Sequence, residues 1–268
     1  MHLDVCRSFR EIFSLSALFW PFSPCIQRKN VVYYTEISRC KRRPAVNRSL
    51  SFQNILFDLD GTLTASHEGI IKCVQYSLSF YGIEEEADRL FCFIGPPLLR
   101  SFQEHYGFSE EQGMEAVEHY RVRYNEVGYM ENRVYDGILP LLEKLKNAGK
   151  NILLATSKPY AQTMKILNHF GLAPYFEKDF VLAAGLDDRL NSKAAIIGEA
   201  LAALERHGIS KEGSVMVGDR IHDIEGAKKN QLPIIGVEYG YAPAGELQEA
   251  GADYIVSTVE ELGEFLLG

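Results

Sequence analysis

The stretch that most constrains the fold is residues 54–64, where an apolar run leads directly into two carboxylates. Residues 55–57 (Ile-Leu-Phe) have the uniform hydrophobicity of a short strand buried on both faces, as in the middle of a parallel sheet. Asp58 and Asp60 follow, and burial of an unpaired carboxylate is costly. Both must therefore lie where solvent or a cation compensates them, and the carboxyl end of a strand in an open α/β sheet is such a place.

The net charge of −8 hides an uneven distribution. Residues 1–51 carry nine basic and three acidic side chains, a net charge of +6, so the other residues together carry −14. Nonspecific binding to nucleic acids depends on basic side chains, and an acidic body disfavours it. We therefore expect no nucleic-acid polymer as a partner. A phosphate ester would have to be bound by local groups and a metal.

The cysteines favour a reducing compartment. Their odd number and irregular spacing fit neither a set of disulfides nor a zinc site. No uncharged apolar run is long enough to cross a bilayer, so we expect no membrane partner and a cytoplasmic location. The five cysteines are Cys6, Cys25, Cys40, Cys73 and Cys92.

Residues 1–51 differ from the rest of the chain. An apolar run at residues 12–20 superficially resembles a signal peptide, but acidic residues precede it, prolines follow it and no convincing cleavage site is present. The basic cluster at residues 39–43 could be a targeting signal, although short basic runs are usually solvated. We expect a disordered extension that takes no part in the fold.

Residues 68–135 predict a small helical cap domain. Ile70, Val74 and Leu78 recur at helical spacing, and Ser109 with Gln112 forms a possible capping box for a later helix. A turn with two prolines at residues 93–98 must interrupt any helix between them. We therefore expect this segment to be inserted between the first two strands of a core formed by residues 52–67 and 136–268.

From residue 135 onward, helical and strand patterns alternate. Apolar runs at residues 152–156, 180–182, 215–217, 234–237 and 254–256 predict strands, with amphipathic helices between them. This alternation is typical of an α/β fold with a doubly wound parallel sheet, similar to a Rossmann fold. The glycine fingerprint of dinucleotide binding follows none of the strands.

Three further loops at predicted strand ends carry polar side chains. Thr156 lies where a strand leads into a helix, whose free N–H groups favour an anion. Lys193 lies at the start of another helix, where a cation opposes the helix dipole unless a phosphate is bound nearby. Asp219 and Asp223 follow a second buried strand, and two strand ends with carboxylates suit a hard, oxygen-seeking cation. Each signal is weak when taken alone.

Taken together and in this order, the four loops resemble the four motifs of the haloacid dehalogenase superfamily, most of whose members are Mg²⁺-dependent phosphatases. The resemblance extends from residue 52 to the C-terminus. It implies Asp58 as nucleophile, Asp60 as general acid and base, and Thr156 with Lys193 as phosphate-binding residues. It also implies a Mg²⁺ site formed by Asp58, the backbone carbonyl of Asp60, and Asp219, with Asp223 as a supporting carboxylate. The cap and the turn at residues 94–98 resemble the phosphoglycolate-phosphatase-like group, which includes 5′-nucleotidase-like members.

The resemblance implies hydrolysis of a small phosphorylated metabolite through an aspartyl phosphate, with a phosphoglycolate phosphatase as the first expectation. A 5′-nucleotidase acting on nucleoside monophosphates is the alternative. A phosphomutase shares these residues, and a non-catalytic phosphate-binding protein remains a further alternative. Dehalogenation is disfavoured because the dehalogenases lack the counterpart of Asp60. The cap offers four charged candidates for substrate contacts, for each of which a surface role is favoured: Arg100, His105, Arg121 and Arg123.

Overall fold

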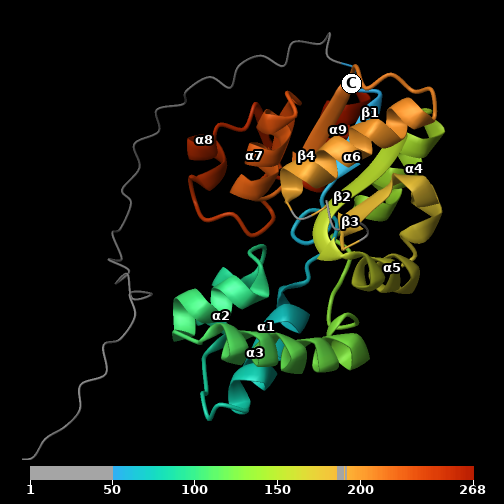
Figure 1. Ribbon diagram of the computed structural model, residues 1–268. Helices are drawn as coiled ribbons and strands as arrows, with labels where there is room; N and C mark the ends of the chain where they lie inside the picture. Colours follow the sequence, from blue (N-terminus) through green and yellow to red (C-terminus); the bar gives the residue numbers. More distant parts are fainter. Residues whose placement is uncertain (1–50, 186–189, 191) are drawn as a thin grey trace, which may run out of the picture. The chain divides into compact units, whose positions relative to one another are not determined.

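A computed structural model describes residues 51–185, 190 and 192–268 (Figure 1). The predicted N-terminal extension, up to residue 50, lies outside the described residues. Within the described part, six parallel strands form one sheet in the order β3-β2-β1-β4-β5-β6, which confirms the predicted fold class. The strands are β1 (Asn54–Phe57), β2 (Asn151–Pro159), β3 (Val181–Ala184), β4 (Ser214–Gly218), β5 (Ile234–Val237) and β6 (Tyr254–Val256).

Each strand of the sheet sends alternate side chains to opposite faces. Ile55 and Phe57 of β1 pack into one apolar layer, and Leu56 packs into the other. Helices complete both layers, so every residue of β1 is buried. This burial on both faces explains why its sequence is a continuous apolar run from residue 55 to 57. The first layer contains α4 (Ile138–Asn147), α5 (Tyr160–His169) and α9 (Val259–Leu267); the second contains α6 (Lys193–Arg206), α7 (Ile221–Lys229) and α8 (Glu246–Ala250).

The strand order has its switch point between β1 and β4. From β1 the chain adds β2 and β3 on one side, and it then returns to add β4, β5 and β6 on the other. Connections on either side of such a point diverge and leave a crevice beyond the carboxyl ends of the two strands. The first and fourth polar loops of the sequence leave the sheet at this crevice.

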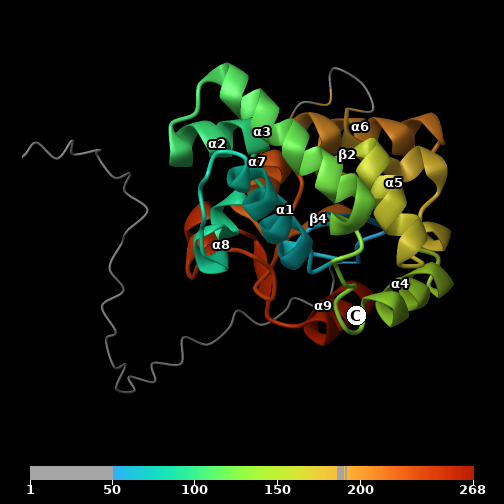
Figure 2. The same cartoon turned by 90° about the horizontal axis from the view of Figure 1, so that it is seen from below.

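Three helices between β1 and α4 have an apolar core of their own: α1 (His67–Ser79), α2 (Leu98–Tyr106) and α3 (Glu110–Arg123). The buried side chains of α1 include Ile70, Val74 and Leu78, as their spacing predicts. Ser109 and Gln112 form the expected capping box at the start of α3. Figures 1 and 2 show these helices as a group at one end of the sheet. We call this group the cap; its domain boundaries stay a prediction.

The chain enters and leaves the cap through two adjacent linkers. The N–H of Ala65 donates to the backbone carbonyl of Arg133 at 2.7 Å, and the N–H of Tyr135 donates to the backbone carbonyl of Leu63 at 3.1 Å. The remaining short helices are η1 (Ala87–Arg89), η2 (Phe91–Phe93), η3 (Tyr124–Gly128), η4 (Ala173–Tyr175) and η5 (Lys178–Phe180). No helix among the described residues is long and apolar enough to span a membrane.

The π-helical turn η3 departs from the regular helix that the sequence predicts after the capping box at Ser109. It continues α3 by one wider turn, beside α1. The reason is a close backbone approach, since a Cβ at Gly69 of α1 would lie 2.1 Å from the carbonyl oxygen of Gly128. This approach places Tyr124, the first residue of the turn, in the cap core.

Candidate active site

Asp58 directly follows β1 and continues its pairing with β4. Its backbone N–H donates to the carbonyl of Val217 at 2.9 Å, and the residue is only 7% exposed. Gly61 forms the turn that follows, with a φ of +89°. A Cβ there would lie 2.1 Å from Asp219 Oδ2, so glycine is needed for this loop to pass the second strand end.

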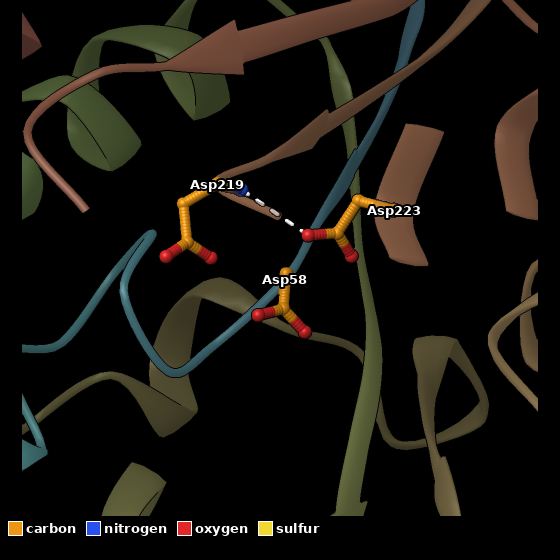
Figure 3. A group of neighbouring side chains, drawn as sticks. All are labelled: Asp58, Asp219 and Asp223. Atoms are coloured by element: carbon orange, nitrogen blue, oxygen red, sulfur yellow. Dashed lines mark hydrogen bonds between the residues drawn. The ribbon is translucent and has the colours of Figure 1, made fainter. Parts of the chain in front are cut away.

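Asp219 follows β4, the neighbour of β1, and Asp223 lies in the first turn of α7. Asp223 Oδ2 accepts hydrogen bonds from the backbone N–H groups of Asp219 at 3.2 Å and Arg220 at 3.1 Å. Figure 3 shows the first of these bonds. The four-residue spacing therefore lets one carboxylate satisfy the free N–H groups that lead into α7.

The carboxylates of Asp58, Asp219 and Asp223 converge on one space (Figure 3). One oxygen from each lies within 4.8 Å of the others. Asp219 Oδ2 accepts from the N–H of Tyr241 at 2.7 Å, whereas Asp219 Oδ1 is buried and makes no hydrogen bond to the described residues. A buried carboxylate oxygen of this kind, beside two further carboxylates, calls for a compensating cation. The donor set is all oxygen, and it therefore fits a hard divalent cation such as Mg²⁺.

Crowding of the three carboxylates changes how they bind protons. Burial raises the pKa of Asp58 to about 6; the positive charge of Lys193 opposes this rise, and the negative charge of Asp223 adds to it. Burial, followed by the charges of Asp223 and Asp58, raises the pKa of Asp219 well above its usual value. A bound cation would reverse these effects because it favours the ionised carboxylates.

Lys193 is the first residue of α6 and lies inside the cluster of carboxylates. Its Nζ is 2.5 Å from Asp58 Oδ1, 2.7 Å from Asp223 Oδ1 and 3.0 Å from the carbonyl oxygen of Ala155. Burial lowers the pKa of Lys193, but the charges of Asp223 and Asp58 outweigh it and the net pKa is raised. The ammonium group is thus a fixed positive charge beside Asp58, where the sequence predicts a phosphate-binding lysine.

Replacing Lys193 with Met is expected to destabilise the metal-free protein, because Asp58 and Asp223 would lose their buried cation. Removing one partner of a buried pair costs about 3–5 kcal/mol. Urea unfolding at pH 8 with EDTA measures this loss, and Lys144→Met on the exposed face of α4 serves as the control. Excess Mg²⁺ should restore part of the stability. An unfolding free energy equal to that of the control would show that Lys193 is not paired in solution.

Thr156 lies near the end of β2, which runs three residues further than the predicted strand at 152–156. The residue is 1% exposed, and its hydroxyl accepts from the N–H of Lys158 at 3.3 Å. The register with β3 shifts between Thr156 and Pro159, so the strand is irregular where it reaches the site. Thr156 borders the same cavity as Asp58, as a phosphate-binding residue must.

Asp60 does not add its carboxylate to the cluster. Asp60 Oδ2 instead pairs with Lys158 Nζ at 2.6 Å. Burial lowers the pKa of Lys158, but the charge of Asp60 and other nearby groups raise it overall. Lys158 is not among the predicted site residues, which include only Thr156 from this loop. A lysine at a strand end, opposite an otherwise unpaired aspartate, is a signal that could have identified it. The proposed metal contact of the Asp60 carbonyl stays a prediction.

A cavity of about 570 Å³ lies between these strand ends and the cap. Arg220 links its two walls: it donates to the carbonyl of Ile94 in the cap at 2.8 Å and to Glu246 at 2.8 Å. Of the four charged cap candidates, only Arg121 lines the cavity, and like Arg100 and Arg123 it also pairs with a glutamate of the cap. The other cap residues that line it are Ile70, Phe93, Ile94, Gly95, Pro96, Pro97, Leu98, Leu99, Val117 and Tyr120.

The chain is similar in sequence and fold to several known proteins. The chain is 43% identical over 201 residues to a 5′-nucleotidase from Pseudomonas aeruginosa, which covers 75% of this chain and 89% of the relative. It is 35% identical over 227 residues to the tyrosine-protein kinase PtkA from Mycobacterium tuberculosis, covering 84% of this chain and 76% of that one.

A solved structure of a predicted phosphatase from Clostridium acetobutylicum is 45% identical, with a TM-score of 0.73, and the match covers 81% of this chain and 99% of that chain. Residues 55–237 match the family model of haloacid dehalogenase-like hydrolases. These matches confirm the predicted enzyme class, a hydrolase of the phosphatase type. The chain therefore belongs to the haloacid dehalogenase-like hydrolases.

Proposed function

We propose that this protein is a Mg²⁺-dependent phosphatase that hydrolyses a small phosphate monoester through an aspartyl phosphate on Asp58. The observation that carries the proposal is the position of Asp58. It lies at the switch point of the sheet, beside Asp219, Asp223 and the fixed charge of Lys193. A carboxylate held in this way is a nucleophile aimed into a cavity.

The residues around Asp58 supply the other requirements of phosphoryl transfer. Asp58 and Asp219 would hold Mg²⁺, and its positive charge would let an anionic carboxylate approach an anionic phosphate. Lys193 exchanges its contacts with carboxylates for a contact with a phosphoryl oxygen, and Thr156 adds a hydroxyl donor. Their positions at the ends of buried elements keep the phosphoryl group in line with Asp58.

Asp60 moves the protons. In the first half of the reaction, Asp58 forms a bond to phosphorus, the bond from phosphorus to the leaving oxygen breaks, and protonated Asp60 gives its proton to that oxygen. In the second half, the Asp60 carboxylate takes a proton from water as the water attacks the aspartyl phosphate. This returns both aspartates to their starting states and releases inorganic phosphate.

Within this reaction we favour nucleoside 5′-monophosphates over phosphoglycolate as substrates. The cap wall of the cavity is apolar and contains two aromatic rings, Phe93 and Tyr120, which suit a nucleoside. Arg121 is the one charged side chain among the described cap residues of this wall. The carboxylate of phosphoglycolate would need such a cation, but Arg121 is already paired with Glu118 at 3.4 Å. The similarity to a 5′-nucleotidase supports the same choice.

We also propose a cytoplasmic location. The buried Cys73 forms no disulfide with any described residue, as expected in a reducing compartment.

Hydrolysis rates measured side by side with Mg²⁺ test the proposed substrate class. We expect kcat/KM for nucleoside 5′-monophosphates to exceed that for phosphoglycolate by about tenfold or more, because the nucleoside would fill the apolar pocket and phosphoglycolate would not. Arg121→Met should leave the nucleotide rates within about threefold, and Arg100→Met, an exposed cap arginine, is the matched control. A preference for phosphoglycolate that Arg121→Met abolishes would reverse the substrate choice. Cleavage of no ester at all would reject the function.

A further inference from the structure

Lys158 is a buried charge outside the carboxylate cluster. Its side chain is 6% exposed and lies at the end of β2. Burial of a lysine ammonium is costly unless its partners compensate for lost water. The structure shows two such partners: Asp60 Oδ2 at 2.6 Å and the ring of Tyr124, whose centroid is 5.0 Å from Nζ. The second contact is a cation–π interaction.

The pairing leaves the two oxygens of Asp60 in different environments. Oδ2 is held by Lys158, whereas Oδ1 is buried and makes no hydrogen bond to the described residues. Asp60 lines the cavity together with Asp58. Oδ1 is therefore the oxygen of Asp60 that has no partner among the described residues, whereas Oδ2 is already held by Lys158.

Tyr124 brings the cap into this arrangement. It is 1% exposed and begins the π-helical turn η3. Its ring stacks on Tyr120, with centroids 5.5 Å apart and an interplanar angle of 12°. Tyr120 borders the cavity. Lys158 thus contacts the acid and base candidate on the core side and, on the cap side, a tyrosine stacked on the cavity wall.

We propose that Lys158 is a positioning residue for Asp60, holding Oδ2 so that Oδ1 exchanges protons with the leaving oxygen and then with water, while the cap's Tyr124 keeps Lys158 in place. The inference rests on the proposed phosphatase function. The bonds that form and break are those of the two half-reactions given above. Lys158 itself gains and loses no proton.

The test compares two leaving groups in the first half-reaction. Nitrophenolate departs without a proton, whereas the alkoxide of the best ester in the substrate panel needs one. With Lys158→Met, the rate of phosphorylation of Asp58 by nitrophenyl phosphate should stay within about threefold of wild type. The rate with the alkyl ester should fall by about tenfold or more, because a misplaced Asp60 would lose part of the rate acceleration that a well-placed general acid provides. Rapid-quench measurement of nitrophenol or alcohol release in the first turnover reports both rates.

Three variants calibrate the result. Asp60→Asn shows the full selective loss, and Lys158→Arg, which keeps a charged donor, should recover part of the alkyl-ester rate. Lys165→Met is the matched control. This exposed lysine also joins the core to η3, through Asn125 at 3.3 Å, and lies 5.5 Å from the ring centroid of Tyr129. It contacts no active-site carboxylate, so both rates should remain at wild-type values.

The outcomes separate the two proposals. Equal losses with both substrates in Lys158→Met, or the same selective loss in Lys165→Met, would overturn the role of Lys158 and leave the phosphatase function intact. A wild-type protein that releases neither alcohol nor nitrophenol would overturn the function itself, and the role of Lys158 with it. Should Lys158→Met not fold, Lys158→Gln, which lacks the charge, gives the same comparison.

Discussion

Replacing Asp58 with Asn is expected to abolish turnover of every phosphate ester, because an amide cannot form the aspartyl phosphate. Loss of a nucleophile commonly lowers kcat by about 10⁴-fold or more. Nitrophenyl phosphate should fare no better than an alkyl ester, because the missing group is the attacking one. Steady-state rates with both esters, together with acid-quench trapping of the phosphorylated protein, measure this effect. Asp88→Asn, an exposed change in the cap, should keep full activity.

The same substitution should not weaken the fold of the metal-free protein, because Lys193 keeps its ion pair with Asp223 at 2.7 Å. Burial raises the pKa of Asp58 from its ordinary value of 3.8 to about 6, so the ionised carboxylate destabilises the native state above pH 6. Removing that charge raises the unfolding free energy at pH 8, and the gain should disappear as the pH falls toward 4. Urea unfolding at both pH values checks the sign. Retained turnover in Asp58→Asn, or a protein that unfolds at pH 8, would reject the assigned role of Asp58.

Removing the divalent cation is expected to abolish activity and to lower stability at the same time. Lys193 pairs with only two of the three buried carboxylates, Asp58 and Asp223, so a cation that binds the native state compensates the charge that remains. Binding at one hundred times Kd stabilises a protein by about 2.7 kcal/mol. Excess EDTA should therefore stop turnover, and titration with MgCl2 should raise Tm in a saturable manner. Isothermal calorimetry on the EDTA-treated protein gives Kd without using activity.

Asp219→Asn provides the control for this effect. Asp219 Oδ1 makes no hydrogen bond to the described residues, so an amide there removes charge without breaking a hydrogen bond at that atom. The variant should lose the Mg²⁺-dependent rise in Tm as well as activity. Full turnover in excess EDTA would contradict the assignment of Asp58 and Asp219 as ligands. So would a Tm that responds equally to Mg²⁺ in the wild type and in Asp219→Asn.

Several elements of the fold were predictable because their causes are local. The alternation of apolar helices and strands follows from the spacing of side chains along the chain. Capping is equally local: Ser109 caps α3 and Thr258 caps α9 through residues three positions away. That Asp58 and Asp219 each follow a fully buried strand is also a local property, although their position beside each other requires that β1 pair with β4.

Other features depend on contacts between distant parts of the chain. Lys158 and Asp60 are 98 positions apart, and their pairing requires that β2 lie next to β1. The apolar wall of the cavity requires the cap to lie over the strand ends, where Arg220 meets Ile94 across 126 positions. The π-helical turn η3 arises from the approach of α1, which no pattern within α3 encodes.

The sequence by itself determined the α/β class, the helical insertion and the order of the polar loops. The spacing of apolar residues and the placement of carboxylates after buried strands are properties of short segments, so they can be recognised without the folded structure. The resemblance names Asp58, Asp219 and Asp223, whose carboxylates converge, but only the tertiary structure decided that the carboxylate of Asp60 pairs with Lys158. The reason is that a buried charge interacts most strongly with the charges nearest to it in the folded chain. In the low-dielectric interior these interactions are strong, and a few ångströms change their energy greatly.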